Sequence, residues 1–180
     1  RDRTGRRIQF DNPLYSTIKK EFSDDIEFIT GRVYKNVTAS FGNEKSSYSV
    51  RAVNPDHQFI EKSEIKEGRF INPLDIKNNT KNIVIGNLVV EDLFGGIDPI
   101  GKYLDLNKIK FKIVGVFVER TEGSDSNEAR VIYMPISTAQ KIYGNNDYID
   151  QINLTYNQNL SEEEAVAFGN KIVDKIKDVF

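Results

Sequence analysis

Residues 67–118 read EGRFINPLDIKNNTKNIVIGNLVVEDLFGGIDPIGKYLDLNKIKFKIVGVFV, and this stretch decides the fold class. The short apolar run at 82–86 predicts a strand, and the apolar spacing within 87–94 predicts a helix. After a turn, residues 102–106 and 109–118 alternate apolar and polar side chains, which is typical of two strands joined as a hairpin. The stretch therefore predicts a domain that mixes strands with helices.

The turn that follows the predicted helix nearly matches a phosphate-binding motif. Gly96, four residues, Gly101 and Lys102 fit G-x-x-x-x-G-K, but Tyr103 stands where Ser or Thr would hold a magnesium ion. The motif also needs a strand before the loop and a helix after it, whereas here the predicted order is helix, turn, strand. We therefore interpret the glycines as the end of a helix, where glycine relieves left-handed strain, and expect no nucleotide at this turn.

The composition excludes several kinds of chemistry. The chain has 180 residues, which is enough for one large domain or two small ones. Its net charge of −2 comes from interspersed acidic and basic residues, so no basic field favours nucleic acid. The absence of cysteine and the single histidine exclude disulfides, thiolate metal sites and two-histidine metal sites. No run of about 18 apolar residues predicts a transmembrane helix.

The polar residues that could suggest catalysis are better explained by local structure. His57 lies in the turn Asn54-Pro55-Asp56-His57-Gln58, and we expect it at the surface or as a capping residue rather than as a base. The acidic stretches 24–25, 91–92 and 162–164 each consist of adjacent residues, which do not indicate carboxylates facing each other across a cleft. Three further aspartates are expected to bond their own turns: Asp56, Asp75 and Asp98.

The rest of the chain predicts a long hairpin flanked by helices. Residues 26–41 and 47–53 should form antiparallel strands joined by the turn at 42–45. The other expected elements are a helix at 12–22 capped by Asp11 or Asn12, a helical turn at 55–60, a cap from Asn87 for the 87–94 helix, a strand at 130–134, a helix up to Tyr143 capped by Ser137, a strand at 148–156, and a final helix that begins with the capping box Ser161–Glu164.

These elements predict an α+β fold with a discontinuous division. Residues 1–62 and 146–180 should form one layer of helices on an antiparallel sheet. Residues 63–145 should form a mixed α/β insert with a small core of its own.

A set of short segments occurs in a characteristic order along nearly the whole chain. The segments are Gly5–Phe10, Val50–Asp56, Gly68-Arg69-Phe70 with Asp75, Val84-Ile85-Gly86, Leu93-Phe94-Gly95, Asp98–Lys102, Phe111–Val116 and Pro135–Gln140. As an ordered set, they resemble the periplasmic core domain of MacB-type ABC transporter permeases, within the wider MacB/FtsX-like permease family.

The resemblance implies a fold and a mechanical function. It implies a Porter-like subdomain built from both ends of the chain and an inserted Sabre-like subdomain, placed between two transmembrane helices of a bacterial inner-membrane permease, on its periplasmic side. In that family, ATP-driven movement in the cytoplasm passes through the membrane to paired periplasmic domains. These domains meet a periplasmic adaptor, also called a membrane fusion protein, and through it an outer-membrane channel. The resemblance therefore implies no catalysis, cofactor or metal in this chain. Because the sequence begins with Arg1 rather than Met, we expect a fragment of a longer protein, and we expect that fragment to be a monomer.

Two exposed segments are the expected partner contacts, because contacts concentrate on loops. A solvated loop without a partner explains each segment equally well. The residues are Gly42, Asn43, Glu44 and Lys45 at the hairpin turn, and Thr121, Glu122, Gly123, Ser124 and Asp125 in a polar loop that runs to Glu128.

Three alternatives remain open at this point. A lipoprotein-releasing permease domain of the LolC/LolE kind would carry a substrate-capturing loop and need no adaptor. A free-standing extracytoplasmic ligand-binding module would be stabilised by a small molecule. A secreted enzyme would need a cleft on which carboxylates with shifted pKa values converge.

Overall fold

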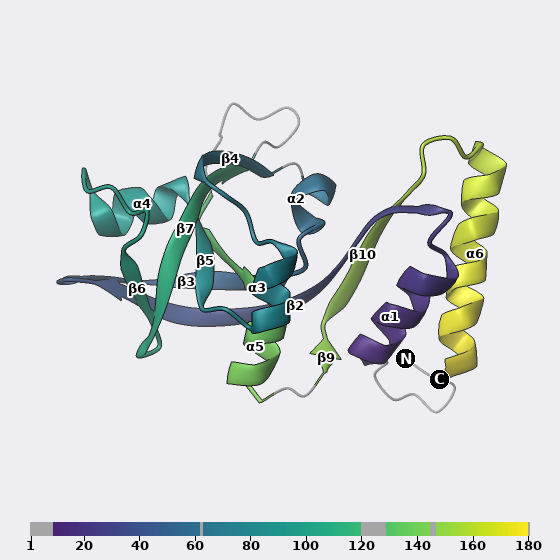
Figure 1. Ribbon diagram of the computed structural model, residues 1–180, viewed down its shortest axis with the longest axis horizontal. Helices are drawn as coiled ribbons and strands as arrows, with labels where there is room; N and C mark the ends of the chain where they lie inside the picture. Colours follow the sequence, from purple (N-terminus) through teal and green to yellow (C-terminus); the bar gives the residue numbers. More distant parts are fainter. Residues whose placement is uncertain (1–8, 62, 120–128, 145–146, 180) are drawn as a thin grey trace.

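A computed structural model of the protein describes residues 9–61, 63–119, 129–144 and 147–179. The described chain forms a ring of strands and, beside it, a layer of two helices on a strand pair (Figure 1). The predicted α+β class is thus confirmed in its mixture of helices and sheet. The predicted loop residues Thr121–Asp125 lie outside the described residues.

Strand β2 (Ile26–Phe41) is the longest strand and belongs to both parts. Its first half pairs antiparallel with β10 (Gln151–Tyr156), and its second half pairs antiparallel with β3 (Glu44–Val53). The hairpin predicted from the sequence is therefore confirmed, and its second strand begins three residues earlier than expected.

Six strands close into a ring. From β3 the order continues through β8 (Val131–Pro135), β5 (Asn82–Gly86), β7 (Ile109–Glu119) and β6 (Tyr103–Leu106), and β6 pairs back onto β2. The β3–β8 and β5–β7 pairs are parallel, and the remaining pairs of the ring are antiparallel. The predicted 102–118 hairpin thus supplies the strand that closes the ring.

Two strands form the ends of the eight-stranded sheet. Strand β4 (Ser63–Gly68) pairs with β7 at one end, and β10 forms the other end. Strand β4 carries three charged residues, Glu64, Lys66 and Glu67, and its pairing with β7 is irregular. Strand β10 reads QINLTY and carries no charge.

The remaining described elements cover the sheet. The short strands β1 (Phe10–Asp11) and β9 (Tyr148–Ile149) pair with each other in a separate small sheet. The helices are α1 (Asn12–Glu21), α2 (His57–Ile60), α3 (Pro73–Asn78), α4 (Asn87–Phe94), α5 (Ile136–Ile142) and α6 (Glu162–Val179).

The buried apolar side chains form three clusters. The largest is shared by the ring strands with α4 and α5, and it includes the fully buried Val33, Val50 and Ile83. A second cluster forms around Tyr133, together with residues such as Phe117. The third lies between the helices and the strand pair, with the members Leu14, Ile18, Ile29, Phe168 and Ile172.

The predicted caps at the two ends of the chain are confirmed. Asp11 Oδ1 accepts the backbone N–H of Leu14 at 2.9 Å, so Asp11 caps α1 and Pro13 occupies its first turn. Ser161 and Glu164 form the reciprocal capping box, with Ser161 N–H to Glu164 Oε2 at 2.7 Å. Both caps use local geometry that the sequence spacing contains.

Two other predicted caps are wrong, because their side chains instead form hydrogen bonds with segments far away in the sequence. Asn87 is the first residue of α4 rather than its cap, and its Oδ1 accepts the backbone N–H of Ala129 at 2.9 Å. Ser137 lies inside α5, and its hydroxyl donates to the carbonyl of Ile76 at 2.7 Å. The predicted strand at 148–156 is also broken at Asp150, which separates β9 from β10.

The turn after α4 is a helix end, as the sequence indicates. Gly95 follows the last residue of α4 with a φ of +56°, and the next strand, β6, begins at Tyr103. The order of elements is thus helix, turn, strand, whereas a phosphate-binding loop lies between a strand and a helix.

One part of the predicted division needs a correction: the expectation that residues 63–145 form a small core of their own. Strand β3, from the segment 1–62, pairs with β8, from the segment 63–145. The largest cluster also combines Val33 and Val50 with Ile83 and Phe111. The insert therefore does not close a core of its own, because β2 and β3 complete its ring. The division into domains at these boundaries stays a prediction.

We expect the closing strand to stabilise the ring through Leu104, which is fully buried on β6. Replacing it with alanine should lower the free energy of unfolding by about 2–5 kcal/mol, because a cavity forms in a packed core. Tyr103→Ala on the same strand is the matched control, since Tyr103 is 58% exposed, and it should cost less than about 1 kcal/mol. Urea unfolding measures both; equal losses would contradict the packing of β6.

Candidate functional site

The predicted contact residues of the hairpin lie at one extreme of the molecule. Gly42 and Asn43 form the turn between β2 and β3, Glu44 and Lys45 begin β3, and all four are exposed. Gly42 has a φ of +59°, a conformation that favours glycine. In Figure 1 this turn lies at the far left, away from α1 and α6 on the right.

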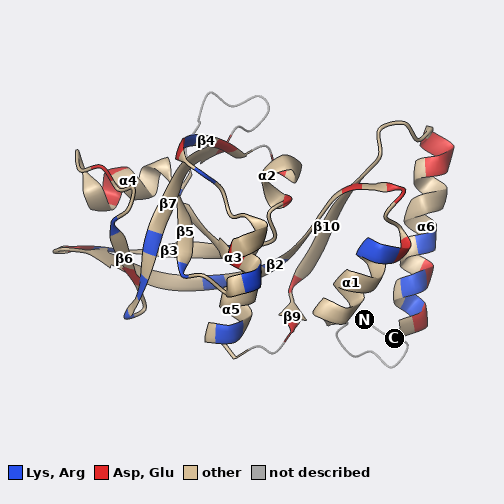
Figure 2. Ribbon diagram, in the orientation of Figure 1, with Lys and Arg blue, Asp and Glu red and all other residues tan. Residues whose placement is uncertain are grey.

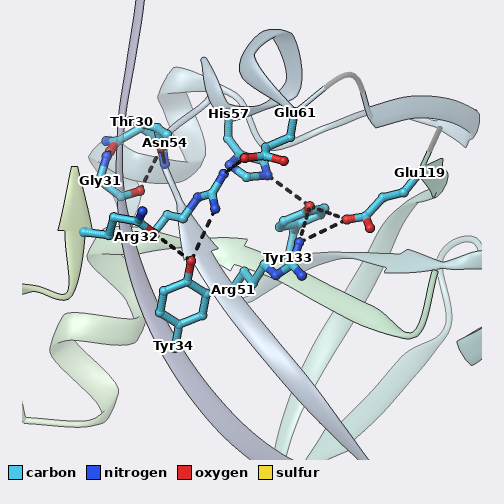
Figure 3. Close-up of polar contacts among 11 residues, drawn as sticks. Thr30, Gly31, Arg32, Tyr34, Arg51, Asn54, His57, Glu61, Glu119 and Tyr133 are labelled. Carbon is cyan, nitrogen blue, oxygen red and sulfur yellow. Dashed lines mark hydrogen bonds and ion pairs between the residues drawn. The ribbon is translucent and has the colours of Figure 1, made fainter. Parts of the chain in front are cut away.

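The two parts of the fold meet at Arg32 on β2. Arg32 is paired with Gln151 of β10 and also with Val53 of β3, so the strand exchanges one neighbour for the other at this residue. We call the polar residues that surround this exchange the β2 joint: Thr30, Arg32, Tyr34, Asn54, Asp56, Glu61 and Asp150. Figure 3 labels Thr30, Arg32, Tyr34, Asn54 and Glu61 of this group.

Side chains from the end of β3 continue the pairing of β2 where β3 itself has stopped. Asn54 Oδ1 accepts the backbone N–H of Gly31 at 2.8 Å, and Asp56 Oδ2 accepts that of Ile29 at 3.2 Å. In return, the Asn54 backbone N–H donates to Thr30 Oγ1 at 3.0 Å. These bonds satisfy backbone donors that would otherwise be unpaired next to the core.

Arg32 forms the charged part of the joint. The residue is 7% exposed, and its side chain donates to Glu61 and to the hydroxyl of Tyr34, the latter at 3.2 Å. Burial acts to lower the pKa of Arg32, but the hydrogen bonds with Tyr34 and Glu61 outweigh burial and raise it. Tyr34 then donates to Gln151 Oε1 at 2.9 Å, which ties the arginine to β10.

Asp150 holds the joint from the other side. The backbone N–H of Tyr34 donates to Asp150 Oδ2 at 2.8 Å, and the hydroxyl of Tyr148 donates to Oδ1 at 2.5 Å. The backbone N–H of Asp150 donates to the carbonyl of Arg32 at 2.8 Å. The break between β9 and β10 therefore has a cause, since Asp150 turns its carboxylate onto β2.

His57 is fully buried, which corrects its predicted place at the surface. Its Nε2 lies 2.9 Å from the hydroxyl of Tyr133, and that hydroxyl donates to Glu119 Oε1 at 2.9 Å. Because the tyrosine proton goes to Glu119, Nε2 carries the histidine proton and donates it to Tyr133. Arg51 completes this group by pairing with Glu119 at 3.1 Å (Figure 3).

The environment of His57 keeps it uncharged. Burial, followed by the nearby Arg32 and Arg51, lowers the pKa of His57 to about 3. Burial and the neighbouring Glu119 likewise raise the pKa of Tyr133. A histidine that is neutral, enclosed and bonded to a buried tyrosine therefore positions α2 against the sheet.

Asp75 is the one aspartate of the three predicted turn carboxylates that is fully enclosed. It accepts hydrogen bonds from Arg69, Asn72, Thr80 and Asn82 at distances between 2.7 and 3.3 Å. Burial acts to raise the pKa of Asp75, but these bonds outweigh burial and lower it to about 2. The carboxylate of Asp75 is thus charged at neutral pH and fixes the loop before α3.

The other two predicted turn aspartates are less enclosed. Asp98 is exposed and accepts the backbone N–H of Ile100 at 3.0 Å, as a turn residue does. Asp56 is half-buried, and its bond goes to β2 rather than to its own turn.

The described residues contain no group of three or more histidine, cysteine, aspartate or glutamate side chains that could hold a metal ion. None of the helices in the described ranges is long and apolar enough to cross a membrane. The joint groups are engaged with one another, so the arrangement supports a positional role.

The joint was not predicted from the sequence. The sequence places Asn54, Pro55 and Asp56 in a turn and predicts that Asp56 bonds that turn, whereas the side chains of Asn54 and Asp56 bond β2. A polar pair directly after a strand is a weak signal for such bonds, because the partner strand is 23 to 27 residues away in the sequence. His57 gave no usable signal, since its partner Tyr133 is 76 residues away.

Comparison with known proteins gives a consistent result. The family model described as MacB-like periplasmic core domain matches residues 2–167. The macrolide export ATP-binding/permease protein MacB of Campylobacter fetus is 33% identical over 125 residues, which cover 69% of this chain and 19% of that protein. The corresponding protein of Bdellovibrio bacteriovorus is 28% identical over 152 residues, covering 84% and 23%. The chain thus spans about a fifth of the length of these relatives.

Two solved structures share the fold. The periplasmic region of MacB from Actinobacillus actinomycetemcomitans gives a TM-score of 0.82 at 20% identity, covering 99% of this chain and 78% of that one. The extracellular domain of YknZ, a noncanonic ABC-type transporter from Gram-positive bacteria, gives 0.81 at 18% identity, covering 98% and 87%. At these identities the likeness establishes the fold alone.

We expect Asn54→Ala to weaken the joint, because it removes the acceptor for the buried Gly31 N–H. The unfolding free energy should fall by about 1–3 kcal/mol. Asn36→Ala on β2 is the matched control, since the exposed Asn36 side chain accepts a hydrogen bond from the Ser49 hydroxyl at 3.3 Å at the surface, and it should change stability by less than about 0.5 kcal/mol. Urea unfolding followed by circular dichroism compares them; equal effects would contradict the role of Asn54.

His57 should make stability depend on pH. In the unfolded chain it binds a proton below a pKa of about 6.5, whereas its folded pKa is lowered to about 3. The contribution of His57 to the free energy of unfolding is therefore fully present above about pH 6.5. It is lost as the pH falls, by about 2 kcal/mol between pH 7 and pH 5, because the unfolded chain then binds a proton that the folded chain does not. His57→Gln should lack this component. Parallel urea titrations of both proteins test it, and identical pH slopes would overturn it.

Proposed function

Because the chain belongs to the family of MacB-like periplasmic core domains, we propose that it acts as the extracytoplasmic domain of an ABC transporter permease. In this role it transmits ATP-driven conformational change across the membrane for export or efflux. The observation that carries the proposal is the continuity of β2 through the joint. One strand links the helical layer to the hairpin turn at the far end of the ring.

The arrangement of the helices supports this direction of transmission. The start of α1 and the end of α6 lie at the same, lower right side of Figure 1, and the β2–β3 turn lies at the opposite, left side. Both helices pack on β2 and β10 through the third cluster, which includes Ile18, Ile29 and Phe168. A movement of these helices therefore acts directly on β2.

In the finer architecture, residues 1–62 with 146–180 are the Porter-like part, and residues 63–145 are the inserted Sabre-like part. Strands β2 and β3 of the Porter-like part complete the ring of the Sabre-like part. The hairpin β2–β3 belongs to the first segment by sequence and to the ring by pairing.

The proposed parent is a dimeric bacterial inner-membrane permease, with this domain at its periplasmic face and coupled to a cytoplasmic ATP-binding domain or subunit. The relatives are named macrolide export ATP-binding/permease proteins, which supports this coupling. A periplasmic adaptor and, through it, an outer-membrane channel would be the partners. The isolated chain would be a monomer without catalytic activity of its own. Light scattering at high concentration tests this state, and a stable dimer would contradict it.

The proposal is tested in the full-length parent with the joint weakened. Asn54→Ala should leave the rate of ATP hydrolysis nearly unchanged while export falls several-fold, because the domain still folds but no longer transmits movement rigidly. Export is measured as macrolide resistance in cells that carry the parent, and ATP hydrolysis is measured in reconstituted membranes. Membrane levels of the variant are compared by immunoblotting.

Lys110→Ala provides the control, because Lys110 is exposed on β7, away from the joint. It should leave both export and ATP hydrolysis unchanged. Full export by an Asn54→Ala protein whose isolated domain shows the expected loss of stability would sink the mechanical proposal.

A further inference from the structure

The β2–β3 turn forms one wall of an open groove, which we call the tip groove. Its other wall is the end of α4 with the turn that follows, and its volume is about 480 Å3. The lining residues used below are Phe41, Glu44, Glu91, Asp92, Phe94 and Ile97. The sequence predicted contacts at this turn, but it gave no indication that α4 would lie beside it.

The floor of the tip groove is apolar. The rings of Phe41 and Phe94 stack with their centroids 4.1 Å apart, so the two walls are packed together. At the rim, Ile97 is 51% exposed even though the turn around it is fixed by the bond from its N–H to the carbonyl of Phe94 at 3.0 Å. A held, half-exposed isoleucine next to two aromatic rings offers a contact for an apolar side chain.

The rim of the tip groove is acidic, and two of its carboxylates lie at the end of α4, where negative charge destabilises a helix. Glu91 and Asp92 lie in the last turn of the helix, which contains no basic residue (Figure 2). The C-terminal end of a helix carries partial negative charge, so carboxylates there are destabilising. Glu44 adds a third carboxylate from the opposite wall. A cation bound in the groove would relieve this repulsion.

The three carboxylates differ in how far they are already neutralised. Asp92 pairs with Arg130 at 3.2 Å and accepts the hydroxyl of Tyr48 at 2.8 Å. Glu44 and Glu91 are exposed and make no ion pair among those found in the described part of the chain. Two carboxylates, one on each wall, therefore remain to receive a partner's charge across an apolar floor.

We propose that the tip groove docks a cationic segment of a partner protein, in which Lys or Arg residues flank one apolar side chain. The apolar side chain would contact Ile97 and the edge of the Phe41–Phe94 stack, while the basic residues would pair with Glu44 and Glu91. This rests on the proposed function in one respect: the segment belongs to an accessory protein on the extracytoplasmic side.

The first test titrates the 15N-labelled chain with the capped peptide acetyl-Arg-Leu-Arg-amide at low ionic strength. Saturable changes in the backbone amide signals should be confined to residues 41–44 and 91–97. The peptides acetyl-Glu-Leu-Glu-amide and acetyl-Arg-Gly-Arg-amide test charge and apolar contact separately, and both should bind more weakly. Equal binding of the acidic peptide, or changes spread over the whole surface, would overturn the proposal.

The double variant Glu44→Gln with Glu91→Gln should weaken binding of acetyl-Arg-Leu-Arg-amide by about fivefold. Glu67→Gln is the matched control, because Glu67 is exposed on β4 and does not line the groove, and it should change binding by less than about twofold. Octylammonium chloride tests a small cationic amphiphile as the occupant. If this amine binds more tightly than acetyl-Arg-Leu-Arg-amide, and the double variant weakens both to the same extent, the assignment to a protein segment is overturned.

The second test uses the full-length parent with Glu44→Lys and Glu91→Lys. Export should fall several-fold while ATP hydrolysis and membrane level stay as in the unchanged protein. If these substitutions leave export intact while Asn54→Ala abolishes it, the tip groove is not a docking site and the mechanical function stands. If neither affects export, the proposed function falls as well.

Discussion

The pairing of β2 with two successive neighbours is the constraint on which the rest of the structure depends. A strand can exchange one partner for another only if the backbone groups left free on each side of the exchange are satisfied. Asn54 and Asp56 supply acceptors on one side, and Asp150 supplies them on the other. With those groups paired, the helical layer and the ring can share a strand without a flexible linker between them.

The buried charges of this protein contribute more to fixing the positions of the surrounding segments than to the free energy of unfolding. The guanidinium of Arg32 is buried while its partner Glu61 is partly exposed, and the carboxylate of Asp75 is buried against Arg69. Removing either partner would leave an uncompensated buried charge, so the geometry around Arg32 and Asp75 is difficult to distort in small steps. That property suits a domain whose proposed task is to move as a body.

Local features of the fold could be predicted from the sequence, and long-range ones could not. The caps at Asp11 and Ser161, the hairpin of β2 with β3 and the glycine end of α4 all follow from spacings of a few residues. Closure of the ring depends on pairing between Ala39 and Leu106, and no periodicity in either strand contains that information. The caps expected from Asn87 and Ser137 were wrong for the same reason, since each side chain bonds a segment far away in the sequence. The same holds for the candidate site. The exposure of Gly42–Lys45 could be predicted from turn chemistry, whereas the β2 joint could not, because it depends on the register of three strands.

The two ends of the sheet are protected unequally. Glu64, Lys66 and Glu67 with an irregular pairing make β4 a poor template for another strand, in the way that natural edges usually avoid aggregation. Strand β10, QINLTY, carries no charge or proline and has β2 as its one strand neighbour in the described sheet. We therefore expect intermolecular strand pairing in a concentrated solution of the isolated domain to begin at β10 rather than at β4, and a single lysine on β10 to reduce it.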